Sequence, residues 1–251
     1  MGYCPTVIFG GGTWDAIHNS ERASWYNTTK LYTAWGLLIE AAKGQECGDH
    51  LSDAFVFDLV DVGREYLSVV PCMKWYNALA AASTPAAVHA ANASMAEFMS
   101  DLDRLLGASA GFLLGQWIGD ARRIAATHEA ADFLEWNARA QVTSWFPAST
   151  PAACNGTATA TNPLYDYGNK AWSGLVKGYY DKRYQIYAQS KICRIDPTAV
   201  TVEGLTCEGF NYVGQLVKLA CDFQHLTGPV PTMATGNALA ISEELWTKYA
   251  P

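Results

Sequence analysis

Charged residues are scarce in this sequence: they make up 16% of its 251 positions, whereas the hydrophobic residues AVILMFWYC account for 50%. Disordered chains show the opposite balance, so the composition predicts a folded protein with a substantial core. Positive charge is the scarcer sign, because 17 Lys and Arg stand against 24 Asp and Glu, giving a formal net charge of -7. Nucleic-acid and anionic-membrane binders need surplus positive charge, and the sequence disfavours both functions.

Long hydrophobic runs are also missing. Residues 105–119 carry no charge but are too short to span a bilayer, and residues 75–96 contain Pro85, His89 and two asparagines. The first fifteen residues, MGYCPTVIFGGGTWD, lack the basic start and the sustained apolar run of a signal peptide. We therefore expect no membrane span, and no signal peptide within this chain.

The usual signatures of metal, phosphate and nucleophile chemistry are absent. The five His form no H-E-x-x-H and no Glu-x-x-His pair, no CxxC occurs, and no Lys-Ser/Thr follows the Gly10–Gly12 run. We predict no metal and no cofactor. Three carboxylate pairs lie on single predicted helices, where helix caps or solvated faces are the expected roles: Asp58/Asp61, Asp101/Asp103 and Glu129/Asp132.

Features of a secreted protein are nevertheless present. N-x-S/T sequons stand at Asn27, Asn92 and Asn155, and the chain has seven Cys. Together they favour an oxidising compartment and suggest that the chain is a fragment of a longer secretory protein. Cys193, Cys207 and Cys221 follow one another at 14-residue spacings, and a loop of that length closed by a disulfide is worth about 3 kcal/mol. The spacing does not decide the pairing.

Helical periodicity dominates the chain, and period-2 runs are almost absent. We predict an all-α bundle of about seven to nine helices with a long Pro/Ala/Thr/Gly-rich loop near residues 146–163. Residues 1–23 are expected to be a loop-like connector, and residues 24–251 the helical domain. Helices should start at a Thr28 or Thr29 cap, near Ser52 and at Pro85, with a break at Pro71, and should cover 113–126, 129–145, 166–190, 202–223 and 237–249.

The predicted helix 129–145 has an unusual inward stripe. Phe133 and Leu134 share a face with Asn137 and Gln141, and a buried amide must be hydrogen-bonded, since stranding it costs about 1–3 kcal/mol. Bonds to neighbouring helix ends are at least as plausible as contacts to a substrate. Glu135 and Arg139 form an i,i+4 pair worth about 0.3–0.5 kcal/mol if exposed.

Aromatic residues stand at both ends of the long loop. Trp145 precedes it, and the run Leu164, Tyr165, Asp166, Tyr167 follows it. Aromatic faces at such positions can wall a sugar pocket, because pyranose rings stack on them, but ordinary core packing explains the same pattern.

Two long segments carry a specific resemblance. The stretches LLGQWIGDARRIAATHEAADFLEWNARAQVTSWFP and LYDYGNKAWSGLVKGYYDKRYQIY, together with SWYNTTKLYTAWGLLIEAA upstream, resemble the C-terminal helical region of the α-N-acetylglucosaminidases, glycoside hydrolase family 89. The resemblance is strong over residues 24–190 and weak beyond them. It implies an exo-acting, retaining glycosidase that removes terminal α-linked N-acetylglucosamine, acting in animals on heparan sulfate in lysosomes.

The resemblance also implies a partner domain. Family members carry their two catalytic Glu on a TIM-type barrel, about 5–5.5 Å apart as in retaining enzymes, and the helical domain packs beside that barrel. The family's pocket-wall tryptophan corresponds to Trp145, and its positions after the loop to Leu164 and Tyr167, with Asp166 between them. Arg139 matches a family arginine that we interpret as structural, a role we also expect for Asn137 and Gln141. The loop 146–163 is longer here than in animal members, which leaves the pocket's shape open.

Three hypotheses follow from the sequence. The leading one is a C-terminal helical domain that completes the N-acetylglucosamine pocket beside a catalytic barrel, in a lysosomal, vacuolar or secreted protein. The alternative is a free-standing helical interaction module without catalysis. A third, a complete small glycosidase using one of the chain's own carboxylate pairs, lacks any convergent pair.

Overall fold

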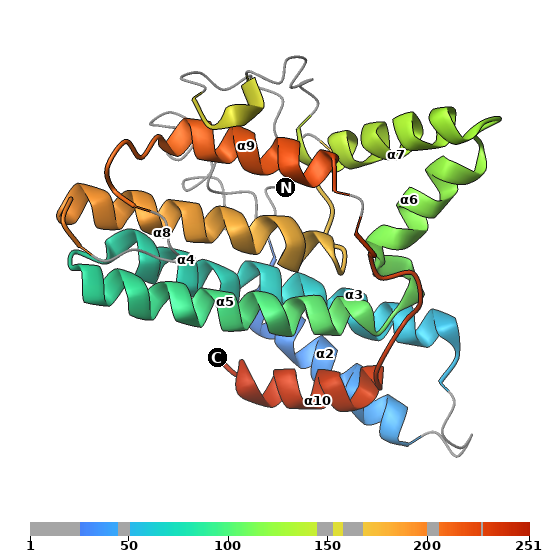
Figure 1. The fold of residues 1–251 in the computed structure, drawn as a ribbon. Coiled ribbons are helices and arrows are strands. Elements are labelled where there is room, and N and C mark those ends of the chain that lie inside the picture. The colour runs from blue at the N-terminus through green and yellow to red at the C-terminus, as the bar shows by residue number, and fades with distance from the viewer. Residues whose placement is uncertain (1–25, 45–50, 145–152, 158–167, 200–205, 227) are drawn as a thin grey trace.

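A computed structural model describes residues 26–44, 51–144, 153–157, 168–199, 206–226 and 228–251. Within these residues the chain is an all-α bundle with no strand, as the periodicity predicts; one isolated parallel bridge joins Leu113 to Ser173. The predicted connector 1–23 lies outside the described residues. The helices shown in Figure 1 are α2 (Thr28–Lys43), α3 (Asp53–Val69), α4 (Pro71–Ala81), α5 (Pro85–Gly107), α6 (Leu114–Arg123), α7 (His128–Thr143), α8 (Asp181–Ile195), α9 (Tyr212–Gln224) and α10 (Ala238–Lys248).

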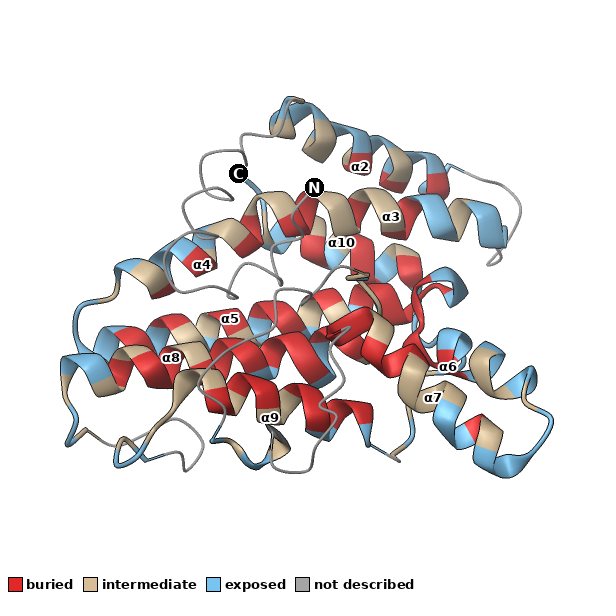
Figure 2. Ribbon diagram, turned by 90° about the horizontal axis from the view of Figure 1, so that it is seen from above, coloured by how far each residue is buried: buried red, intermediate tan, exposed pale blue. Residues whose placement is uncertain are grey.

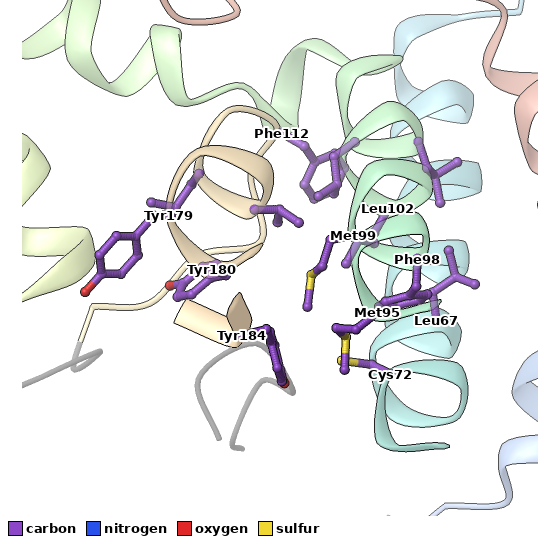
Figure 3. Packing of buried hydrophobic residues seen from close by; sticks show 14 of the residues in the cluster. Leu67, Cys72, Met95, Phe98, Met99, Leu102, Phe112, Tyr179, Tyr180 and Tyr184 are labelled. Atoms are coloured by element: carbon purple, nitrogen blue, oxygen red, sulfur yellow. The ribbon is translucent and has the colours of Figure 1, made fainter. Parts of the chain in front are cut away.

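The buried side chains concentrate where α5, α8 and α9 lie beside one another, as the red segments of Figure 2 show. On α5, Met95, Met99 and Leu102 are fully buried, and Figure 3 shows them facing Tyr180 and Tyr184 from the start of α8. Aromatic rings and flexible Met side chains fill such a core without leaving voids. This centre of the bundle is the rigid support for the segments on its surface.

Helix α10 packs against α2 and α3 (Figure 1). Tyr32 stacks on Trp246 with ring centroids 4.8 Å apart, and the indole Nε1 of Trp246 donates a hydrogen bond to the Tyr32 carbonyl. The Tyr66 hydroxyl donates to the carbonyl of Tyr249 at 2.8 Å. Helices far apart in the sequence are therefore joined into one bundle.

Several helices start where the sequence predicts them. The side chains of Ser52 and Thr84 accept hydrogen bonds from the first turns of α3 and α5, and α4 starts afresh at Pro71. The cap of α2 is Asn27, one residue before the predicted Thr28 or Thr29, because its side-chain oxygen accepts from the amide of Lys30.

Two predicted helix starts are wrong. Residues 168–174 are not helical, and the helix expected from 166 begins at Leu175 with a π-helical turn, η4 (Val176–Tyr180), before α8. Gly174 breaks the pattern with φ = 88°, a conformation that suits glycine. Helix α9 likewise starts at Tyr212, capped by Asn211, and not near residue 202.

Disulfides close loops around α8 and α9. Cys193 pairs with Cys207 across 14 residues, one of the spacings noted in the sequence, and Cys221 pairs with Cys154. Cys72 is disulfide-bonded as well. None of the helices in the described ranges combines the length and apolarity needed to cross a membrane.

Candidate functional site

The four predicted substrate-contacting residues, Trp145, Leu164, Asp166 and Tyr167, lie outside the described residues. The structure does describe the residues on either side of them: the end of α7 before Trp145, the turn 153–157 inside the long loop, and the backbone from Gly168 onward. These three described segments are the points at which the chain that carries the four residues is attached to the bundle.

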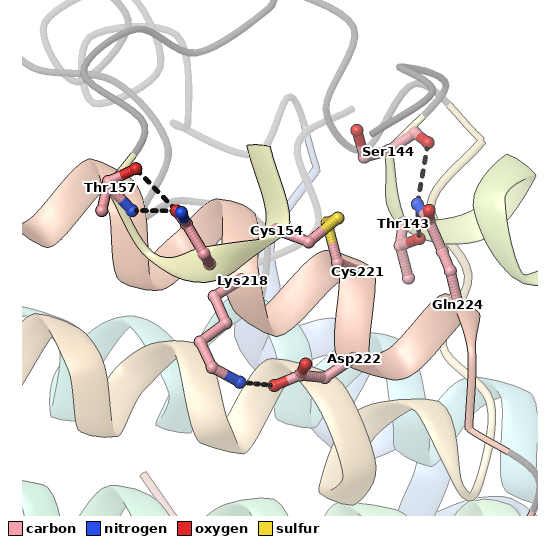
Figure 4. The surroundings of a disulfide bond; sticks show 9 residues. Thr143, Ser144, Cys154, Thr157, Lys218, Cys221, Asp222 and Gln224 are labelled. Atoms are coloured by element: carbon pink, nitrogen blue, oxygen red, sulfur yellow. Dashed lines mark hydrogen bonds and ion pairs between the residues drawn. A yellow bond between two sulfur atoms is a disulfide. The ribbon is translucent and has the colours of Figure 1, made fainter. Parts of the chain in front are cut away.

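The first attachment point is the end of α7. Thr143 and Ser144 are buried, and Gln224, at the last position of α9, donates from Nε2 to the Thr143 hydroxyl (3.3 Å) and to the Ser144 carbonyl (3.2 Å; Figure 4). Thr143 in turn donates to the carbonyl of Arg139 at 2.8 Å. These bonds fix the backbone position from which the chain continues to Trp145.

Arg139 precedes this end of α7 by one turn, and its side chain is buried rather than exposed at the helix surface. Its Nε and Nη2 both donate to Glu135 Oε1, at 2.9 and 2.8 Å, while the Arg139 side chain is only 1% exposed and that of Glu135 19%. The guanidinium also lies 5.5 Å from the ring of Phe223 on α9. Within the described part of the chain, its Nη1 has no hydrogen-bond partner. Removing one partner from a buried pair is far more costly than breaking an exposed one.

The buried face of α7 is not the face predicted from the sequence, which carries Phe133, Asn137 and Gln141. Asn137 and Gln141 are half-buried, whereas Phe133 is 62% exposed, and the buried face is formed by Ala131, Ala138, Arg139 and Val142. The reason is that α6 and α7 form a hairpin that projects from the bundle (Figure 1), so that only part of the surface of α7 is covered. Trp117 of α6 closes the hairpin by donating from its indole Nε1 to the Ala138 carbonyl.

The second attachment point is the turn containing the short 3₁₀ helix η3 (Ala153–Asn155). Cys154 is bonded to Cys221 of α9, with Cα atoms 5.7 Å apart (Figure 4). Asn211, before the first turn of α9, donates from Nδ2 to the carbonyl of Gly156 at 3.4 Å. A methyl group on Gly214 would overlap that same carbonyl, so the turn lies tightly against the helix.

The third attachment point follows the long loop. Asp103 of α5 accepts hydrogen bonds from the Ser173 hydroxyl (3.0 Å) and from the amides of Gly174 (2.8 Å) and Lys177 (3.1 Å). Burial raises the pKa of this carboxyl above its ordinary value, although the three hydrogen bonds oppose the shift. Asp103 therefore acts as a cap supplied from a distant helix, in agreement with the cap role expected for this carboxylate.

Other carboxylates of the predicted pairs serve the fold. Asp61 bonds Arg64, Asp132 bonds Arg122, and Asp101 accepts from the Tyr249 hydroxyl at 2.9 Å. Across the described ranges, no group of three or more His, Cys, Asp and Glu side chains could hold a metal ion.

A groove of about 850 Å³ borders the third attachment point, between α5, α10 and residues 230–237. Its polar lining is occupied by internal contacts: Arg104 forms two hydrogen bonds with Glu244, and Asn237 caps α10.

Three contacts near the attachment points were not predicted from the sequence. Gln224 and the partner of Cys154 had no local signal, because each acts through a tertiary contact. The pairing of Trp117 with Trp172, whose rings lie 5.9 Å apart, was also missed. Both tryptophans are evident in the sequence, but nothing in the sequence places α6 beside residues 168–173.

Comparison with known proteins assigns the chain to a family. The family model described as "Alpha-N-acetylglucosaminidase (NAGLU) C-terminal domain" matches residues 5–248, nearly the whole chain. The chain belongs to this family. The human α-N-acetylglucosaminidase is 25% identical over 230 residues, which cover 90% of this chain.

Solved structures show the same fold in a bacterial relative. A family 89 glycoside hydrolase from Clostridium perfringens, in complex with its substrate GlcNAc-α-1,4-galactose, matches 96% of this chain with a TM-score of 0.70 at 20% identity. The same bacterial hydrolase in complex with 2-acetamido-1,2-dideoxynojirimycin matches 90% with a TM-score of 0.68 at 21% identity. The chain spans 28% of the human relative and 24–26% of these structures, so the α-N-acetylglucosaminidase C-terminal domain is a minor part of each.

Proposed function

We propose that this α-N-acetylglucosaminidase C-terminal domain completes the pocket for terminal α-linked N-acetylglucosamine beside a catalytic barrel of the same protein. The observation that carries the proposal is the family match over residues 5–248, which includes Trp145, Leu164, Asp166 and Tyr167. These four residues, which we call the sugar-binding wall, are proposed to contact the sugar. The catalytic carboxylates would belong to the barrel, and this chain would supply shape and stacking surface.

The attachment points support this role. A pocket wall contributes to catalysis only if it holds the sugar in a fixed orientation, because misplacement of the reacting bond lowers the rate. Buried groups of α5 and α9 fix the backbone on both sides of the wall: Gln224 before it, and Asp103 after it.

Localisation in a lysosome, vacuole or the extracellular space is part of the same proposal. Disulfides persist in oxidising compartments, and the pairs Cys154–Cys221 and Cys193–Cys207 fit such a compartment. The sequons at Asn27 and Asn155 fall on exposed residues, as attached glycans require.

The direct test uses the full-length protein that contains this chain. Trp145→Ala should lower kcat/KM for an aryl α-N-acetylglucosaminide about tenfold or more, since it removes a stacking face, and Tyr167→Phe should lower it by a smaller factor. Unchanged kcat/KM in both variants would remove the sugar-binding wall from the mechanism.

A free-standing interaction module is the second candidate. Ile124 is 76% exposed and Phe133 62% exposed on the projecting α6–α7 hairpin, and apolar groups in such positions suit a covering partner. The intact mass of the protein isolated from its natural source separates the candidates: a mass that leaves room for a barrel supports the enzyme, and about 27 kDa supports the module.

A further inference from the structure

The segment that leaves α7 is held at both ends by one helix. Gln224 binds Ser144 at the start of the segment, and the disulfide to Cys221 holds Cys154 at its end. Residues 221 and 224 are three positions apart on α9, so the two attachments lie about 5 Å apart along the helix axis. Ser144 and Cys154, ten positions apart in the sequence, are therefore both held by the last part of the same helix.

The disulfide is not isolated on α9. From Cys154 the chain runs along the helix toward its start, where Asn211 donates to the carbonyl of Gly156 and Gly214 leaves room for the close approach. Figure 4 shows Cys154, Cys221, Thr143 and Gln224 on the same side of α9. Helix α9 thus determines the path of the chain on both sides of residues 145–153.

Gln224 has the features of a dedicated holding group. It is 3% exposed, and its Nε2 donates to both Thr143 and Ser144. Its Oε1 has no hydrogen-bond partner in the ranges that the structure describes. Burying an amide with one unsatisfied atom carries a free-energy cost, and an apolar residue of the same size would avoid it. The bonds to the end of α7 are what this glutamine provides.

We infer that Gln224 and the Cys154–Cys221 disulfide, together called the α9 anchor, are positioning groups for the sugar-binding wall, and that substrate affinity depends on the disulfide being formed. The inference rests on the proposed function. The anchor touches no substrate; it limits the positions that Trp145 can occupy. Its loss should therefore weaken substrate binding while the catalytic groups of the barrel continue to work.

The experiment measures KM and kcat separately for the full-length protein with an aryl α-N-acetylglucosaminide. Cys154→Ser/Cys221→Ser should raise KM about threefold to tenfold and change kcat less than about twofold. Gln224→Met keeps the side-chain volume and the disulfide, removes both hydrogen bonds, and should raise KM in the same direction.

The matched control is Cys193→Ser/Cys207→Ser. This disulfide joins Cys193, near the C-terminal end of α8, to Cys207 in the same bundle. Its removal therefore tests how the loss of a cross-link affects stability alone. Its KM should stay within about twofold of the wild-type value, with any loss appearing in the melting temperature.

Two results would overturn the inference: a wild-type KM for both Gln224→Met and the Cys154/Cys221 variant, or an equal rise in KM for the control. Failure of the proposed function gives a different result, because Trp145→Ala would then keep the wild-type kcat/KM. If the Cys154/Cys221 variant does not fold, Gln224→Met alone decides, since it keeps every disulfide.

Discussion

Arg139 is the residue whose energetic role changes most once its surroundings are known. From the sequence it belongs to an i,i+4 pair on a helix surface, but the guanidinium is enclosed between α7 and Phe223 of α9. Glu135 is the anion that compensates it, and Arg122 of α6 donates to the same carboxylate at 2.7 Å. One carboxylate therefore joins the hairpin helix α6 to a buried cation.

We expect Glu135→Gln to lower the free energy of unfolding by about 3 kcal/mol, because it leaves the buried Arg139 charge without its partner. Asp132→Asn is the matched control: Asp132 also binds Arg122, but its side chain is 75% exposed, and its loss should cost less than about 1 kcal/mol. Urea denaturation measures both variants. Equal, small effects would show that the Arg139 pair behaves as an exposed one.

The three sequons differ in their accessibility, which gives a second prediction for single residues. Asn27 and Asn155 are exposed, and their side-chain oxygens accept hydrogen bonds from Lys30 and Thr157. Asn92 lies inside α5, and its buried side-chain oxygen has no hydrogen-bond partner among the described residues. A glycan attached to Asn92 would have to extend from a partly buried side chain of α5.

We therefore expect glycans at Asn27 and Asn155 and none at Asn92 when the protein is produced in a eukaryotic secretory pathway. Mass spectrometry of peptides after enzymatic deglycosylation measures the occupancy of each site. Occupancy of Asn92 equal to that of the other two would contradict the restricted access inferred from its buried side-chain oxygen.

Among the elements, the helix starts show what local sequence can and cannot predict. Ser52 and Thr84 each bond an amide three residues ahead, which is a local interaction, and both starts were predicted. The start of α8 was not, because Asp103, some 70 residues earlier, holds the turn at Gly174. In residues 168–174 the tertiary contact therefore outweighs the helical pattern of the sequence.

The Asp103 cap gives a pH prediction. Burial raises the pKa of Asp103 above its ordinary value, so the folded state binds more protons than the unfolded state between those two pKa values. This contribution to stability is fully present below the ordinary pKa and is lost as the pH rises through the folded pKa.

Asp103→Asn should remove this part of the pH dependence, so that its unfolding free energy falls less steeply than that of the wild type as the pH rises from about 4 to 7. Urea midpoints measured across that range give the slopes. Identical slopes for wild type and Asp103→Asn would refute the assignment.

For the whole molecule, the sequence predicts the fold class and the family, because both depend on periodicity and on motifs that are continuous along the chain. The positions that hold the sugar-binding wall could not be predicted in this way. Gln224, Cys221 and Asp103 reach Ser144, Cys154 and the turn at Gly174 only through the packing of α5, α8 and α9. The family match supplies what the wall is proposed to do, and the bundle supplies the reason that its ends are fixed.

The central claim is that this domain forms part of the pocket for terminal α-linked N-acetylglucosamine. The most direct measurement is kcat/KM of the full-length Trp145→Ala protein for an aryl α-N-acetylglucosaminide, with the melting temperature as the check on folding. We predict a fall of about tenfold or more at an unchanged melting temperature. A folded Trp145→Ala protein with wild-type kcat/KM would contradict the claim.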